Sequence, residues 1–146
     1  MDWVYNDGGR KKAGFKGKTE DCVTRAVAII TKRNYLEVYN ELTKYMFSGR
    51  FNKIKKGKTA RTGIPNRIVK RYMKEKGFNW VSLMGIGTGC KVHLRKEELP
   101  PGEIICNCSK HFVAVIDGVI NDIHDCSRNG TRCVYGYWKK KQEGLK

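Results

Sequence analysis

The sequence predicts an α+β fold in which N-terminal helices pack on a C-terminal antiparallel sheet. Apolar residues recur at helical spacing from residue 19 to residue 77, and beyond that point they alternate as they do in strands. Helices followed by strands, rather than interleaved with them, are typical of α+β domains. With 146 residues and 40% apolar content, the chain can bury one core but not two. We therefore predict a single domain over residues 1–146.

Residues 1–18 mix Gly, Lys and Arg without apolar periodicity, which predicts an extended arm or loop. The first helix is expected from Thr19, which is placed to cap it, with Glu20 and Asp21 in the first turn, where carboxylates suit the helix dipole. Its buried face is formed by Val23, Ala26, Val27 and Ile30. Cys22 is therefore expected at a helix N-terminus.

A second helix is expected to begin at Asn34, whose side chain can cap it together with Glu37, and to end near Ser48 and Gly49. Its buried stripe is predicted to contain Tyr35, Val38, Leu42, Tyr45 and Met46.

Residues 50–62 are basic and contain glycine, so they predict an exposed loop. Pro65 suits the first turn of a third helix that Gly77 ends. Its inward residues are predicted to be Ile68, Val69, Tyr72 and Met73.

The strand-like part of the chain begins after Gly77. The candidate strands are residues 80–84, 91–94, 103–108, 112–116, 119–123 and 132–138.

Asp117 and Gly118 predict a two-residue hairpin, because a type I′ turn needs positive φ at both central positions. In the resulting register Val113 lies opposite Asp122 and His111 opposite His124, so Asp122 is the diagonal neighbour of His111 on one face. A three-residue turn would instead bring Asn121 to that face.

A cysteine at a helix N-terminus and a histidine beside a carboxylate are the groups that thiol catalysis requires. The helix dipole and an imidazolium favour the thiolate, the imidazole moves the proton, and the carboxylate orients the imidazole. We therefore predict Cys22 as nucleophile, His111 as base and Asp122 as the residue that orients it. Glu20 and Asp21 oppose this assignment electrostatically, and His124 is the second choice for the base.

The segments 21–26 and 111–122, Asp-Cys-Val-Thr-Arg-Ala and His-Phe-Val-Ala-Val-Ile-Asp-Gly-Val-Ile-Asn-Asp, resemble papain-like cysteine peptidases. They look nearest to small bacterial peptidases of the bacteriocin-processing type, and they are similar to small uncharacterised papain-like proteins of bacteria and their phages. The resemblance implies a helix packed on an antiparallel half-barrel with the active site between them, and cleavage of an amide, peptide or isopeptide bond. The family's oxyanion-binding Gln, about six residues before the nucleophile, is replaced here by Lys16.

The chain has a formal net charge of +16, and the basic residues between Lys44 and Lys76 are offset only by Glu75. Such a block attracts polyanions, although a solubilising face is an equal alternative. We define the basic patch as Lys53, Lys55, Lys56, Lys58, Arg61, Arg67, Lys70, Arg71 and Lys74. The alternative function is accordingly a papain-like module with weak or no activity that binds nucleic acid or an acidic protein through this patch, as a phage-encoded inhibitor would.

No export signal or apolar run of about 20 residues is present, so we expect a soluble, cytoplasmic protein without membrane contact. Six cysteines in such a protein favour thiols or a metal site over a disulfide framework. Zinc ligands could come from Cys106, Cys108, Cys90 and His93, but paired C-x-x-C motifs are missing, so we predict no metal or cofactor. An Asn129-Gly130 hairpin would place Cys126 opposite Cys133, as core thiols or as a cross-strand disulfide.

Overall fold

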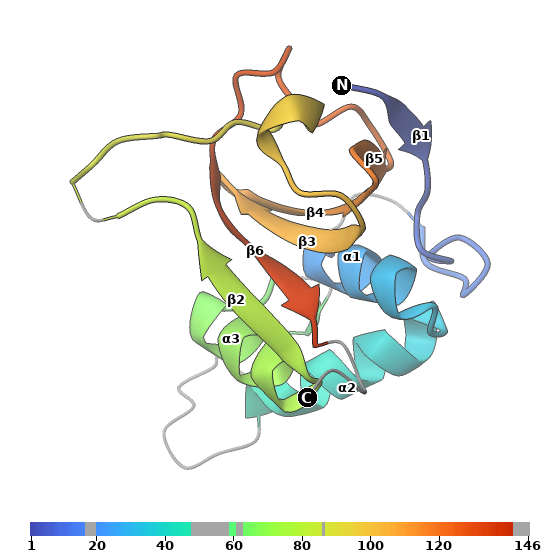
Figure 1. Cartoon of the computed structure of the whole chain (residues 1–146). Coiled ribbons are helices and arrows are strands. Elements are labelled where there is room, and N and C mark those ends of the chain that lie inside the picture. The colour runs from blue at the N-terminus through green and yellow to red at the C-terminus, as the bar shows by residue number, and fades with distance from the viewer. Residues whose placement is uncertain (17–19, 48–58, 61–62, 86, 142–146) are drawn as a thin grey trace.

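The computed structural model describes residues 1–16, 20–47, 59–60, 63–85 and 87–141. In these residues three α-helices lie on one side of a six-stranded sheet (Figure 1). The helices are α1 (Cys22–Thr31), α2 (Tyr35–Phe47) and α3 (Asn66–Glu75), with one 3-10 turn, η2 (Lys96–Glu98). The strands are β1 (Trp3–Tyr5), β2 (Phe78–Ser82), β3 (Glu103–Cys108), β4 (His111–Ile116), β5 (Val119–Asp122) and β6 (Val134–Lys140), in the spatial order β1-β5-β4-β3-β6-β2.

The α+β class is confirmed, but the prediction of a purely antiparallel sheet is wrong at one edge. β1 pairs in parallel with β5, Trp3 facing Ile120 and Tyr5 facing Asp122, so the sheet is mixed. The first 18 residues are therefore not only an arm, because three of them form an edge strand. This strand gives no pattern in the sequence, because all three of its side chains are exposed and its pairing is made by backbone groups far along the chain.

The predicted strand 103–108 coincides with β3, and the others shift by one or two residues at their ends, with one exception. Residues 91–94 form only an isolated bridge between His93 and Cys133. The Asn129-Gly130 hairpin also does not form, because Arg128, Asn129 and Gly130 all take positive φ in a compact turn. Cys126 consequently does not lie opposite Cys133.

The helix predictions hold in their main features. The Asn34 side chain accepts hydrogen bonds from the backbone N–H of Leu36 and Glu37 at the start of α2. The four predicted inward residues of α3 are buried, whereas Tyr45 of α2 is only half-buried. α1 begins at Cys22, so Glu20 and Asp21 precede its first turn rather than occupying it. The predicted cap Thr19, the predicted end of α2 at Ser48 and Gly49, and most of the loop 50–62 lie outside the described residues.

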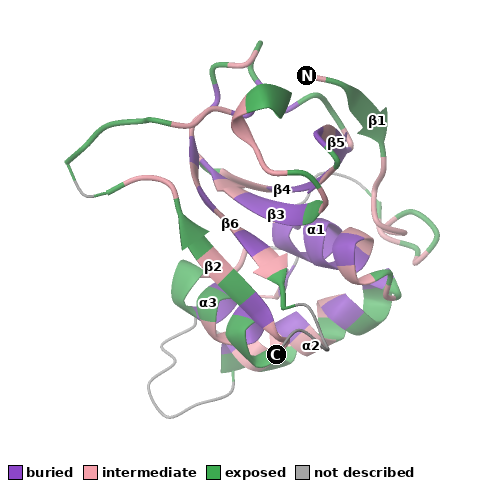
Figure 2. Cartoon of the chain, viewed as in Figure 1, coloured by how far each residue is buried: buried purple, intermediate pink, exposed green. Residues whose placement is uncertain are grey.

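Buried residues run along the central strands and the helix faces next to them (Figure 2). Alternate residues of the sheet belong to two different hydrophobic clusters. On one face Ile105, Ala114 and Trp138 pack against residues of all three helices. On the other face Ile104, Val113, Val115 and Ile120 pack under the segment around Leu94 and Cys126. In the described part of the chain no helix is long and apolar enough to cross a membrane.

Substitution of Gly136 on β6 tests how closely β6 packs against the neighbouring strand β2. A Cβ at this position would lie 2.4 Å from two ring atoms of Trp80 and 2.6 Å from the carbonyl oxygen of Val81. We expect Gly136→Ala to lower the free energy of unfolding by about 1–3 kcal/mol, because the tight contact forces side chains and backbone to shift. Asn79→Ala on the exposed side of β2 should change it by about 0.5 kcal/mol at most. Urea denaturation of both variants measures the difference, and equal stabilities would contradict the packing.

Candidate active site

His111 and Asp122 meet at the open end of the hairpin formed by β4 and β5. Asp117 and Gly118 at the other end have φ values of 48° and 77°, as the predicted type I′ turn requires. Ala114 pairs with Asn121 and Val115 with Ile120, so the predicted register is correct. The side chain facing His111 is therefore that of Asp122, and Asn121 lies in the neighbouring position whose side chain points to the other face.

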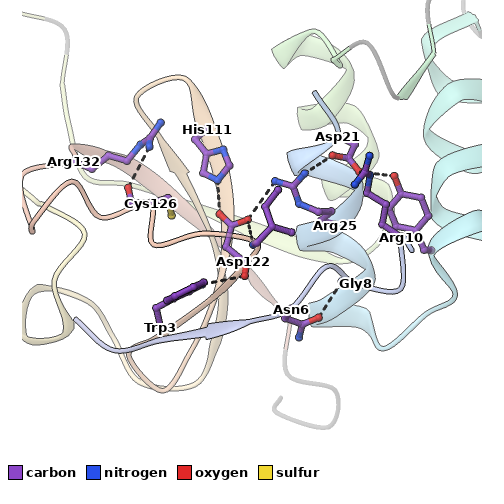
Figure 3. A network of polar contacts seen from close by, with 12 residues as sticks. Trp3, Asn6, Gly8, Arg10, Asp21, Arg25, His111, Asp122, Cys126 and Arg132 are labelled. Carbon is purple, nitrogen blue, oxygen red and sulfur yellow. Dashed lines mark hydrogen bonds and ion pairs between the residues drawn. The ribbon is translucent and has the colours of Figure 1, made fainter. Parts of the chain in front are cut away.

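The His111 ring and the Asp122 carboxylate form a short hydrogen bond, with 2.6 Å between Nε2 and Oδ2. The second oxygen of Asp122, Oδ1, accepts the backbone N–H of Ile123 at 2.7 Å and lies 3.3 Å from Nη2 of Arg25 (Figure 3). The Asp122 side chain is only 3% exposed. Both of its oxygens are thus held by donors, which fixes the carboxylate and, through it, the imidazole.

Cys22 is the first residue of α1, and α1 packs against β4. Against the effect of burial, the His111 ring and the backbone N–H of Phe112 both lower the pKa of the Cys22 thiol. Cys22 and His111 line a cleft of about 570 Å³ between the helices and the sheet. The other residues lining this cleft are Glu20, Val23, Arg25, Gly63, Ile64, Asn66, Asn107, Cys108, Lys110, Phe112, Ile123, His124 and Tyr135. The sulfur is therefore not sealed in the interior but faces a space that a ligand can enter.

The environment of Cys22 and His111 favours the charged form of both groups. Burial alone would raise the pKa of the Cys22 thiol, but the hydrogen bond and positive charge of His111 outweigh it, and the pKa is lowered. Burial alone would lower the pKa of His111, but hydrogen bonds to Asp122, Cys126 and Cys22 raise it to about 11. The arrangement therefore stabilises a thiolate beside an imidazolium.

Asp21 does not act against the thiolate in the way that its position beside Cys22 suggests. It is fully buried and forms an ion pair with Arg25, lies 3.4 Å from Nε of Arg10, and accepts the Tyr35 hydroxyl at 2.5 Å. Its charge is compensated by these partners. The Arg25 guanidinium also lowers the pKa of Cys22, although less than His111 does.

Arg25 is the site residue that the sequence reasoning missed. It is 5% exposed and lies between Asp21 and Asp122, so it connects the start of α1 with the end of β5 (Figure 3). The spacing of four residues between Asp21 and Arg25 was a usable signal for the first pair. The second pair spans 97 positions and has no local signature.

The N-terminal segment, predicted as an arm or loop, and Cys126, predicted as a core thiol, both lie next to the site residues. The Trp3 indole N–H donates to the carbonyl oxygen of Asp122 at 3.0 Å, and the backbone N–H of Asn6 donates to the same oxygen at 2.9 Å. Strand β1 and the residue after it thus hold the backbone of Asp122, the residue that orients His111. Cys126, predicted as a core thiol, is buried, and it is one of the groups that raise the pKa of His111. Burial raises the pKa of its thiol.

The other cysteines are arranged differently from the prediction. Cys133 forms a disulfide with Cys90, not with Cys126. The bridge forms because the segment at residues 90–94 lies along Cys133, where the His93 bridge also occurs. Cys106 and Cys108 are buried free thiols whose pKa values burial raises. Among the described residues, the group whose side chains could together hold a metal ion is His111, Asp122 and His124, none of which is a cysteine.

The basic patch is only partly within the described residues. Lys53, Lys55, Lys56, Lys58 and Arg61 lie outside them. Arg67, Lys70 and Lys74 are exposed along one side of α3, at spacings of three and four residues. Arg71 differs from them, because its guanidinium donates to the carbonyl oxygen of Tyr45 at 2.6 Å and lies over the Tyr45 ring.

Comparison with protein-family models, curated proteins and solved structures finds no match to this chain. The papain-like resemblance therefore stays a prediction from the sequence, and the functional argument depends on the geometry of the site.

Arg25 provides a test of how strongly the site depends on buried charge. We expect Arg25→Met to lower the free energy of unfolding by about 3–5 kcal/mol, because it leaves the buried Asp21 and Asp122 carboxylates without their shared cation. Arg33→Met is the matched control, since Arg33 pairs with Glu41 at 3.0 Å but the pair is partly exposed, and it should cost about 1 kcal/mol or less. Urea denaturation compares the two variants. Equal losses would show that Arg25 does not hold the two carboxylates together.

Proposed function

We propose that this protein is a cysteine hydrolase that cleaves an amide, peptide or isopeptide bond with Cys22, His111 and Asp122. The observation that carries the proposal is that His111, hydrogen-bonded to the Asp122 carboxylate, lines one open cleft together with Cys22 and lowers the pKa of the Cys22 thiol. These residues come from α1, β4 and β5, and each has the chemical type and position that its role requires.

The reaction begins with attack of the Cys22 thiolate on the substrate carbonyl carbon. The tetrahedral intermediate then collapses as the imidazolium of His111 gives its proton to the leaving amine, which leaves an acyl-enzyme. Water, deprotonated by the now neutral His111, attacks the thioester and releases the acid and the thiolate. Because Nε2 of His111 is engaged by Asp122, the other ring nitrogen, Nδ1, is the one that exchanges protons with the substrate and water.

The oxyanion of this intermediate needs donors near the sulfur. The backbone N–H of Cys22 is suited to this, because the first N–H groups of a helix have no partner within the helix. Lys16, which occupies the position of the family's Gln, is not among the residues that line the cleft. We assign the second donor to the side-chain amide of Asn107, which lines the cleft and pairs in register with Phe112, whose backbone N–H lowers the pKa of the Cys22 thiol.

Cys22 should be the reactive thiol of this protein. We expect iodoacetamide at neutral pH to alkylate Cys22 at least about tenfold faster than the other free cysteines, because its pKa is lowered while those of Cys106 and Cys108 are raised. Peptide mapping by mass spectrometry measures the rates, and His111→Ala should bring the Cys22 rate close to that of an ordinary thiol. Equal labelling of all free cysteines in the folded protein would refute the proposal.

The rate of peptide cleavage provides a second test of the hydrolase proposal. Cys22→Ala should abolish cleavage of any peptide that the wild-type protein hydrolyses, while Cys106→Ala, a buried thiol outside the cleft lining, should retain it. Cleavage that persists in a folded Cys22→Ala protein would assign the activity to other residues.

A second candidate function is polyanion binding, and the exposed basic side of α3 favours it. Arg67, Lys70 and Lys74 lie on one helix side, whereas Glu75, the acidic residue of this helix, interacts with Tyr45. Aligned cations of this kind contact phosphates of nucleic acid and release counterions when they do so. This function is compatible with the hydrolase, because α3 begins at Asn66, which lines the cleft.

Charge reversal tests this second function. We expect the triple variant Arg67→Glu, Lys70→Glu and Lys74→Glu to weaken binding to a labelled oligonucleotide, and to flatten the fall of affinity between roughly 50 and 200 mM salt. The control reverses Lys11, Lys12 and Lys91, which are also exposed, and changes the net charge equally. Fluorescence anisotropy measures both proteins. Equal weakening in both would mean that net charge alone, and not α3, attracts the nucleic acid.

A further inference from the structure

The open end of the β4–β5 hairpin carries more donor groups than the proposed hydrolysis uses. His124 follows β5, is exposed, and lines the same cleft as His111. The centroids of the two imidazole rings are 5.7 Å apart, with the rings inclined at 45°. One nitrogen from each ring and one carboxylate oxygen of Asp122 all lie within 4.8 Å of one another. Two imidazoles and a carboxylate therefore converge on one point of the cleft.

We propose that His111, Asp122 and His124 form a reversible Zn²⁺ site, and that zinc bound there blocks the thiol chemistry. The binding part of this proposal stands independently, whereas the inhibitory part rests on the proposed hydrolase function. Imidazole nitrogen and carboxylate oxygen are preferred zinc ligands, and three protein ligands with an open fourth position are typical of accessible zinc sites. The fourth position can be taken by water or by a sulfur, since Cys22 lines the same cleft and the Cys22 and Cys126 side chains both influence the pKa of His111.

The Asp122 ligand is oriented by hydrogen bonds from neighbouring residues, as is usual for zinc ligands in proteins. Oδ1 of Asp122 is held by Arg25 and by the backbone N–H of Ile123, which leaves Oδ2 directed at the His111 ring. Such contacts orient a first ligand shell and strengthen its metal affinity. The exposed His124 ring lies at the entrance and can turn to complete the site. Zinc at bond lengths of about 2.1 Å separates tetrahedral ligands by about 3.4 Å, so only small movements within the 4.8 Å cluster are needed.

Zinc and the catalytic reaction require the same imidazole. A His111 ring with one nitrogen bound to zinc keeps a proton on the other nitrogen, but it cannot become the imidazolium that protonates the leaving amine or offer a free lone pair to deprotonate water. Zinc at this position also attracts the Cys22 thiolate, since sulfur is a preferred ligand. Occupancy of the site and hydrolysis are therefore mutually exclusive.

Isothermal titration of the full chain with Zn²⁺ tests the site. His124→Ala should weaken zinc binding at least tenfold, whereas His93→Ala should leave it unchanged, because His93 lies outside the cluster beside Glu98. His124 is exposed, so its removal should not disturb folding, and circular dichroism checks this. Cys22→Ser should still bind zinc through the three other ligands. Zinc affinity that is the same with and without the His124 ring would overturn the site and assign the metal to the thiols.

Inhibition by zinc is tested separately, through the rates of peptide cleavage and of Cys22 alkylation. Micromolar zinc should slow both peptide cleavage and alkylation of Cys22 in the wild-type protein, and a chelator should restore both. His124→Ala should keep its activity in the presence of the same zinc concentration. If zinc binds through His124 but no peptide is cleaved under any condition, the hydrolase proposal fails and the zinc site stands. If cleavage depends on Cys22 but zinc inhibits both proteins equally, the zinc site fails and the hydrolase stands.

Discussion

The carboxylate of Asp122 is the constraint on which the site depends. It is buried, and a buried carboxylate persists only when donors satisfy its oxygens. One oxygen is bound to His111 and the other to Arg25 and the backbone of Ile123, while Trp3 and Asn6 bind the carbonyl of the same residue. The last residue of β5 thus connects the edge strand β1, the neighbouring strand β4 and, through Arg25, the helix that carries Cys22. The contacts of His111, Arg25 and Ile123 share one carboxylate, so the loss of one of them alters the position of the others.

The same network explains how a thiolate is tolerated next to Asp21 in the sequence. Asp21 is turned away from solvent and compensated by Arg25, Arg10 and Tyr35. Its charge therefore contributes to binding Arg25 rather than to repelling the Cys22 sulfur. Glu20 lines the same cleft as Cys22. The imidazolium of His111, the N–H of Phe112 and the start of a helix all favour the ionised thiol.

The local predictions succeeded where one short segment contains all the information. The Asp117-Gly118 turn determines the register of the hairpin, and this register alone placed Asp122 rather than Asn121 beside His111. The apolar periodicity located the three helices and the capping role of Asn34. Predictions failed where the contact joins backbone groups or sulfur atoms that are far apart in the chain. Strand β1 exposes all three of its side chains and therefore has no hydrophobic pattern. Cys133 forms its disulfide with Cys90, not with Cys126.

By itself the sequence determined the three helices, the strands from β2 to β6, the hairpin register, and the candidate residues Cys22, His111 and Asp122, because turn residues and hydrophobic period act over a few neighbouring positions. Only the tertiary structure decided that Cys22 and His111 line one open cleft and that Arg25 joins Asp21 to Asp122. These contacts join residues far apart in the chain. Their formation depends on how α1 packs against β4, which no local pattern encodes.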